Sequence, residues 1–216
     1  MTYEGIRLRL LSLDRSLFRK IRNKKLVNKE FTIISNNCWG GMIYDSYGLR
    51  KNSPTVGMFI MADDYIKFIS DLRGNTSKEL TFIDPETSRY ADILRKETKF
   101  GSYPVGKIDD MEIMFLHSHS EQEAKEKWER RCQRINWDKL IVKFNDQNGC
   151  TEEHVKIFNE LPFEHKLFFT VRDWPVNKWN GFIKVKQNTK DGFITTSHEP
   201  YVGSKYINLT ELINGL

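Results

Sequence analysis

The sequence predicts an α/β fold: a mostly parallel, open sheet with helices on both faces, in a Rossmann-like arrangement of three layers. Two observations lead to this prediction. Strand-like and helix-like segments alternate along the 216 residues, and several of the strand-like runs are almost continuously apolar. Such alternation is typical of parallel sheets, and continuous apolar runs are typical of strands that are buried on both faces.

The apolar runs and their flanking residues give the expected order of elements. Ser120 can cap the clearest helix, which has glutamates in its first turn and arginines in its last turn. Residues 40–47 form a short helix or turn, and the tail after 171 is irregular apart from a final helix. We expect strands at 30–35, 55–61, 80–84, 110–118, 138–144 and 165–171, and helices at 63–72, 120–135, 151–161 and 209–214.

Length and composition fit one domain with a short appendage. Apolar residues make up 39% of the chain and charged residues 29%, which is typical of a globular protein. We therefore predict a basic amphipathic arm at 1–29 followed by a single α/β domain at 30–216. No apolar run approaches the ~18–20 residues of a membrane span, and the first residues lack the features of a signal peptide.

The three cysteines, Cys38, Cys132 and Cys150, include no closely spaced pair. An odd number of cysteines without a secretory signal favours reduced thiols. We therefore expect a cytoplasmic protein, either free or peripheral at the inner face of the membrane.

The basic charge of the chain is concentrated in the arm. The net charge of the whole chain is +5, whereas 7–29 contains nine basic residues and one acid, so the remaining residues are net acidic. Leu10, Leu13, Leu17 and Ile21 lie three and four residues apart and form one apolar helical stripe. Such a helix either docks on its own domain or lies on an anionic membrane. The arm has no interleaved basic and aromatic residues, so nucleic acid is not an expected partner.

Chemically active side chains follow several of the predicted strands. In open α/β sheets, sites form beyond the carboxyl ends of the strands. If the strands are parallel, one edge of the sheet carries a thiol, an imidazole, amides, a carboxylate and a guanidinium. The residues in question are Asn36, Asn37, Cys38, His117, Asn145, Asp146 and Arg172.

Cys38 is the candidate nucleophile. It lies at a strand-to-helix turn, and amides at a helix N-terminus lower the pKa of a cysteine. His117 can act as its base, and Asn36 or Asn37 can stabilise an oxyanion. The alternative is a buried structural cysteine with asparagines that satisfy the geometry of a turn.

The helix at 120–135 carries a basic stripe, Lys127, Arg131 and Arg134, at helical spacing. Such a stripe can bind phosphate, or it can be a solvated face paired with Glu123 and Glu126. We predict no metal site, because no partner for the histidines has a diagnostic spacing. Neither a dinucleotide-binding nor a P-loop pattern is present.

Linked motifs in the chain resemble a bacterial family of unknown function. They are "ISNNCWGGMIYDSYGL", "SPTVGMFI", "DDYIKFISDL", "YPVG" and "MEIMFLHSHSEQEAKEKWERRCQRINW". The members are grouped as exopolysaccharide biosynthesis proteins of capsule and surface-glycan gene clusters, and are often labelled acetyltransferases. The resemblance runs from about Phe31 to Arg172.

The resemblance implies a transferase of exopolysaccharide or capsule biosynthesis, and acyl transfer to a sugar hydroxyl is our first hypothesis. Alternatives are a glycosyl or phosphoglycosyl transferase, or a glycan-binding or scaffolding component. The donor would be an acyl-CoA or a nucleotide sugar, and the other substrate a glycan or a lipid-linked sugar. We expect Trp39 to stack on a sugar ring, and Arg131 and Arg172 to hold a phosphate. The other expected substrate contacts are Asn36, Asn37, Asn145 and Asp146.

Overall fold

The computed structural model describes residues 3–96, 99–187 and 192–216, and its centre is a four-stranded parallel sheet. The order is β1 (Thr32–Ser35), β5 (Leu140–Asn145), β6 (His165–Thr170) and β7 (Phe182–Lys184), with every neighbouring pair parallel. The predicted parallel sheet is therefore confirmed.

Helices cover both faces of this sheet. Side chains of α2 (Trp39–Tyr47) and α8 (Leu209–Asn214) pack on the face that carries Ile33 and Ile141. Those of α3 (Ala62–Ser70) and α7 (Glu152–Glu160) pack on the face that carries Ile34, Val142 and Phe144. Because side chains alternate along a strand, the two apolar sets lie on opposite faces. The expected three layers follow.

Two predicted strands belong to a second, antiparallel sheet. Its order is β2 (Thr81–Ile83), β3 (Val105–Ile108) and β4 (Met111–Met114). We expected 80–84 and 110–118 to join the parallel sheet. An apolar run shows burial but does not identify the partner strand, and a tight turn with Asp109 at a φ of 52° pairs β4 with β3 instead.

The predicted strand at 55–61 is not regular. Only Phe59 forms a bridge, which is antiparallel to Met114. Gly57 has a φ of 83°, which no strand accommodates. The segment is nevertheless mostly buried, so its apolar pattern indicates burial rather than a strand.

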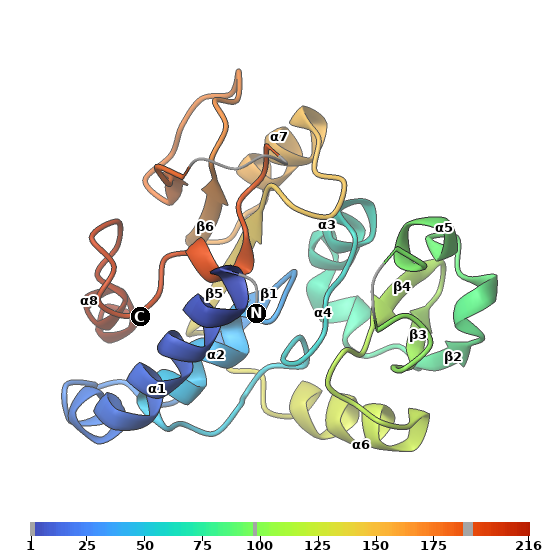
Figure 1. Cartoon of the computed structure of the whole chain (residues 1–216), viewed down its shortest axis with the longest axis horizontal. Coiled ribbons are helices and arrows are strands. Elements are labelled where there is room, and N and C mark those ends of the chain that lie inside the picture. Colours follow the sequence, from blue (N-terminus) through green and yellow to red (C-terminus); the bar gives the residue numbers. More distant parts are fainter. Residues whose placement is uncertain (1–2, 97–98, 188–191) are drawn as a thin grey trace.

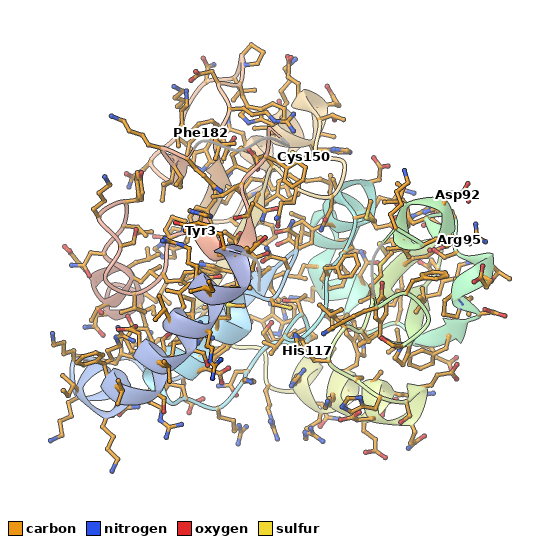
Figure 2. The ribbon with its side chains drawn as sticks, in the orientation of Figure 1. Tyr3, Asp92, Arg95, His117, Cys150 and Phe182 are labelled. Atoms are coloured by element: carbon orange, nitrogen blue, oxygen red, sulfur yellow. The ribbon has the colours of Figure 1, made fainter. Side chains whose placement is uncertain are left out.

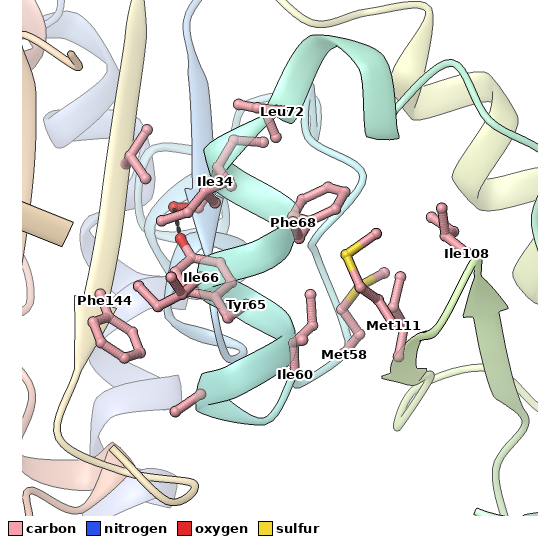
Figure 3. Close-up of a cluster of buried hydrophobic side chains, with 14 of the residues drawn as sticks. Ile34, Met58, Ile60, Tyr65, Ile66, Phe68, Leu72, Ile108, Met111 and Phe144 are labelled. Atoms are coloured by element: carbon pink, nitrogen blue, oxygen red, sulfur yellow. Dashed lines mark hydrogen bonds between the residues drawn. The ribbon is translucent and has the colours of Figure 1, made fainter. Parts of the chain in front are cut away.

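The helix α3 joins the two sheets into one core (Figure 3). Tyr65 on α3 donates its hydroxyl hydrogen to the carbonyls of Ile34 and Lys143 in the parallel sheet. The opposite side of α3 faces Met111 and Ile108 of the small sheet. The connecting elements are α4 (Leu72–Asn75), η1 (Pro85–Thr87), α5 (Ala91–Leu94), α6 (Glu121–Cys132) and η2 (Thr196–His198).

The basic arm forms α1 (Tyr3–Lys24), a 22-residue helix that runs alongside α2 (Figure 1). Asn23 donates to the carbonyl of Tyr47 at 2.8 Å, and Arg7 donates to that of Ser197 at 2.7 Å. The arm is thus docked on the domain through polar contacts. Residues 1–2 of the predicted arm, and 97–98 and 188–191 of the predicted domain, lie outside the described residues. Within the described ranges, no helix combines the length and apolar character needed to cross a bilayer.

Candidate active site

Cys38 and His117 line one cavity of about 490 Å³. Cys38 is the N-cap of α2, immediately after the β1 turn, and His117 follows β4. Residues of α1, α2, α6 and the segment 54–58 complete the walls. His117 is labelled in Figure 2. We expected the two residues to meet at the edge of the parallel sheet. They do meet, but His117 reaches the cavity from the small sheet.

Gly57 positions His117. The backbone N–H of His117 donates to the Gly57 carbonyl at 3.0 Å. A Cβ on Gly57 would lie 3.3 Å from the Cβ of His117, and the φ of 83° is one that glycine adopts without strain. The ammonium group of Lys127, on α6, donates a hydrogen bond to the His117 carbonyl at 3.0 Å. The small sheet, the 54–58 segment and α6 together hold the imidazole in place.

The pKa of His117 is lowered from its usual value of 6.5. Burial is the largest cause, followed by the positive charges of Lys99, Lys51 and Lys127. Burial and nearby cations both disfavour the imidazolium form. His117 is therefore a neutral imidazole at pH 7 and has a lone pair that can accept a proton.

The environment of Cys38 is the reverse of the one we predicted. Its pKa is raised from 9.0 to about 11, first by burial and second by the negative charge of Glu199. The Sγ atom lies 3.8 Å from the Met58 carbonyl, which accepts from the thiol. Our prediction of a lowered pKa is wrong, because desolvation outweighs the effect of the helix N-terminus. Cys38 is a neutral thiol and a hydrogen-bond donor.

Four cations line the same cavity, and we call them the basic rim: Arg15, Lys51, Lys127 and Arg131. Asp45 is the one carboxylate in the lining, and it pairs with Lys51 at 3.1 Å. The predicted basic stripe of α6 therefore contributes two of its members, Lys127 and Arg131. Lys127 also forms the expected ion pair with Glu123, at 2.6 Å.

The two arginines of the basic rim have donors available for an anion. Among the described residues, neither Arg15 nor Arg131 forms an ion pair, and Nη1 of Arg15 is buried without a hydrogen-bond partner. Arg131 donates to the Val56 carbonyl at 2.8 Å. The pKa of Arg131 is lowered, first by burial and then by Arg130 and Arg134. A bound anion would offset both effects.

Lys143 and Glu199 form a buried ion pair, and the side chains of both residues are 0% exposed. Three of the predicted substrate ligands, Asn36, Asn37 and Asn145, form hydrogen bonds with this pair. The ammonium of Lys143 donates to the side-chain oxygens of Asn36 at 3.2 Å and Asn37 at 3.0 Å. The amides of Asn37 and Asn145 donate to the two carboxylate oxygens of Glu199, at 3.1 and 2.8 Å. We call these five residues the buried amide network.

The network is saturated with internal hydrogen bonds. Asn36 donates to Asn145 at 2.8 Å, and the amides of Asn37 and Asn145 also donate to Gln147, at 3.1 and 2.9 Å. Burial lowers the pKa of Lys143, and Glu199 opposes this shift. Asn36 and Asn145 are fully buried, so only Asn37 reaches a cavity, the adjoining one of about 430 Å³ that also contains Cys38 and His117.

Trp39, Asp146 and Arg172 do not line either cavity. Trp39 is fully buried, donates its indole N–H to the Pro200 carbonyl at 2.7 Å and packs edge-on against Phe169, so it cannot stack on a sugar. The carboxylate of Asp146 accepts from the backbone of Val171 at 2.9 Å and of Ile194 at 2.7 Å. Arg172 is exposed and donates to the Gly192 carbonyl. Asp146 and Arg172 follow β5 and β6 as expected, but neither they nor Trp39 reach the cavities.

Four residues of the cavity and the network, Lys143, Glu199, Lys51 and Arg15, are absent from the candidates predicted from the sequence. A signal for Lys143 is present, because a lone lysine inside the apolar run "LIVKF" must find a partner if the strand is buried. Glu199 lies in an irregular tail and has no such signal. Arg15 and Lys51 enter the cavity only through the packing of α1 and of the loop after α2.

The described residues do not bring three or more His, Cys, Asp or Glu side chains together as a metal site. The cavity therefore offers a neutral base, a thiol donor and several cations. This set can bind a phosphate-bearing molecule and accept a proton from it or from a second substrate.

The chain is similar to a family model and to a bacterial protein. A family model described as "Domain of unknown function (DUF1919)" matches residues 11–216. An uncharacterized protein of Haemophilus influenzae is 35% identical over 177 residues, which cover 81% of this chain and 79% of that protein. The family match includes most of α1, so the arm and the domain are matched together.

Proposed function

The chain belongs to the family described as Domain of unknown function (DUF1919), and we propose that it is a transferase that binds a phosphate-bearing substrate in its central cavity. The observation that carries this proposal is the basic rim around a neutral histidine. Four cations and one carboxylate line a cavity of about 490 Å³. Arginine and lysine are the residues that bind phosphate groups in proteins.

The reaction that we propose is acyl transfer from a CoA thioester to a sugar hydroxyl. His117 accepts the hydroxyl proton as the oxygen forms a bond to the carbonyl carbon of the donor. The carbon–sulfur bond then breaks, the electron pair leaves with the CoA sulfur, and the proton passes from His117 to that sulfur. The basic rim holds the phosphates of the bound substrate throughout.

Direct transfer fits the cavity better than a covalent intermediate on Cys38. A thiol with a pKa of about 11 contains very little thiolate at neutral pH. As a neutral donor, the thiol can instead contact the developing oxyanion. We therefore assign His117 as the general base and Cys38 as a hydrogen-bonding contact.

The biological setting of this reaction is also a proposal. The sequence resemblance supports a role in exopolysaccharide or capsule assembly, with the protein in the cytoplasm at the inner face of the membrane. The acceptor would then be a glycan or a lipid-linked sugar. A genetic experiment in the bacterium that encodes the protein tests the setting and the reaction together.

The gene is deleted, and acyl groups are released from the purified surface polysaccharide by mild alkali and quantified. We expect the deletion to remove one acyl substituent and the wild-type gene to restore it. His117→Gln should fail to restore it, and Lys127→Met should restore it only in part. The matched controls are His119→Gln and Lys125→Met, which change neighbouring residues outside the cavity lining and should restore the substituent fully.

A polysaccharide that keeps every acyl group after the deletion would contradict the acyl-transfer proposal. Loss of a sugar residue, with acylation otherwise intact, would identify glycosyl transfer instead. Full restoration by His117→Gln would remove the histidine from the mechanism.

A further inference from the structure

The helix α1 presents its apolar side to solvent. Six large apolar residues lie three or four positions apart and are between 45% and 73% exposed. This spacing places them on one face of the helix. We call this face the exposed stripe; it consists of Tyr3, Ile6, Leu10, Leu13, Leu17 and Ile21.

The opposite side of α1 is the side that contacts the domain. Arg7 and Asn23 make the polar contacts described above, Leu11 packs against the core, and Arg15 lines the cavity. Folding thus buries a largely polar side of the helix and leaves the apolar one uncovered (Figure 1, where α1 lies at the surface). A contiguous exposed apolar patch on a globular protein marks a docking surface.

The charges beside the exposed stripe indicate what covers it. Arg9 and Lys20 are exposed and, at 100° per residue, fall along one border of the stripe, and the exposed Lys24 follows at its C-terminal end. An apolar helical face with a basic border is complementary to a bilayer with anionic headgroups. A second copy of the chain fits less well, because residues 7–29 contain nine basic residues and one acid, and two such arms would repel each other.

The same helix forms a wall of the candidate site. Arg15 lines the main cavity, and Glu4 and Leu8 line the adjoining one, which shares Cys38, Met42 and His117 with it. A helix is ~10 Å across. If its outer face lies in the interface, the cavity is therefore about one helix diameter from the headgroups.

We propose that α1 docks the protein on an anionic membrane through the exposed stripe, and that the phosphate-bearing substrate is a lipid whose headgroup enters the cavity beside Arg15. This inference rests on the proposed function for the phosphate itself. Nη1 of Arg15, which is buried without a partner among the described residues, is the donor that such a phosphate would satisfy.

The first experiment tests docking by co-sedimentation with vesicles of phosphatidylcholine, with and without phosphatidylglycerol. We expect the wild-type protein to bind the anionic vesicles, and Leu10→Gln/Leu13→Gln/Leu17→Gln to bind at least ~10-fold more weakly. Because these side chains are exposed, the triple variant should fold normally. The matched control is Val27→Gln/Ile93→Gln, which changes exposed apolar residues elsewhere and should bind as the wild type does.

The second experiment adds a polyprenyl diphosphate to the anionic vesicles and tests inorganic pyrophosphate in solution. We expect the lipid diphosphate to strengthen binding of the wild type at least ~10-fold, and Arg15→Gln to lose this gain while still binding plain anionic vesicles. A melting curve confirms that Arg15→Gln is folded.

The outcomes separate the two proposals. Pyrophosphate binding without vesicle binding would overturn the membrane inference and leave the proposed function intact. Vesicle binding without any effect of either diphosphate would overturn the phosphate site. A wild-type dimer that the triple Leu→Gln variant converts to a monomer in analytical ultracentrifugation, without vesicle binding, would identify a second copy as the occupant of the stripe.

Discussion

The buried amide network and the basic rim both lie near Cys38, and they differ in how their charges are satisfied. In the network, Lys143 meets one carboxylate and two amide oxygens, and both oxygens of Glu199 accept hydrogen bonds. In the rim, Arg15 has a buried nitrogen without a partner among the described residues.

The contrast separates the polar residues that hold the fold from those that are available for a ligand. A saturated buried group has no donor left to offer, whereas an unsatisfied one gains from binding. Strand-end position alone cannot separate the two. Asn36 and Cys38 follow the same strand, yet Asn36 belongs to the network and Cys38 lines the cavity.

The largest effect should follow from breaking the buried amide network. We expect Lys143→Met to lower the free energy of unfolding by about 3–5 kcal/mol, because Glu199 is left buried without its countercharge. Urea denaturation measures this loss. In the double variant Lys143→Met/Glu199→Gln the two losses should be less than additive. A loss below about 1 kcal/mol for Lys143→Met would show that the pair does not stabilise the domain.

The next largest effect concerns the thiol that lies near both regions. A shift of the Cys38 pKa from 9.0 to about 11 means about 100-fold less thiolate at pH 8. We expect iodoacetamide to modify Cys38 about 100-fold more slowly in the folded protein than in urea, as followed by mass spectrometry of the cysteine peptide. Equal rates in the two states would contradict the raised pKa, and a faster rate in the folded protein would indicate an activated thiolate and return Cys38 to the role of nucleophile.

A smaller loss of stability is expected when Gly57, which contacts His117, is replaced. Gly57→Ala should cost about 1–2 kcal/mol in the left-handed backbone region and should also displace the imidazole. Gly101 has a similar φ of 75°, and a Cβ added there would have nothing within 4 Å. Gly101→Ala should therefore show the backbone cost alone.

Thermal unfolding gives the two stabilities, and the NMR signals of His117 give its environment. A shift of the His117 signals in Gly101→Ala as large as that in Gly57→Ala would contradict the specific contact.

The smallest effect is the titration of His117 itself. Its pKa lies below 6.5 in the folded state, so the folded protein binds this proton less readily than the unfolded chain. Stability should therefore fall as the pH drops below 6.5. Phosphate binding should strengthen over the same range, because the imidazolium adds a positive charge to the cavity.

NMR titration of the imidazole measures the midpoint directly. Phosphate binding is also measured as a function of pH. Its increase below pH 6.5 should be smaller in His117→Gln, because the variant lacks the imidazole. A midpoint at or above 6.5 would contradict the assignment of a neutral base.

The layers of the fold follow from local patterns, and the site follows only in part. Apolar runs and caps such as Ser120 and Thr151, whose side chains accept from the first turns of α6 and α7, are visible in the sequence. The partner of a strand is not visible, so the prediction that β4 joins the parallel sheet is wrong. His117 nevertheless lies in the cavity with Cys38, because its loop packs against the 54–58 segment.

The members of the buried amide network illustrate what sequence reasoning cannot reach. Asn36, Asn37 and Asn145 have the residue types of ligands, but the donors of Asn37 and Asn145 are used by Glu199, which comes from a distant irregular segment. Trp39 is similar, since its indole N–H donates to the carbonyl of Pro200 in the same segment. Local patterns carry no information on such long-range partners.

The central claim is that the basic rim binds phosphate, and isothermal titration with inorganic pyrophosphate tests it most directly. We expect Lys127→Met and Arg131→Met each to weaken binding about 10-fold, and Lys125→Met, on the same helix, to bind as the wild type does. Urea denaturation should show that Lys127→Met changes stability by no more than about 0.5 kcal/mol. Wild-type affinity in both rim variants, or a loss of affinity that only tracks a loss of stability, would contradict the account.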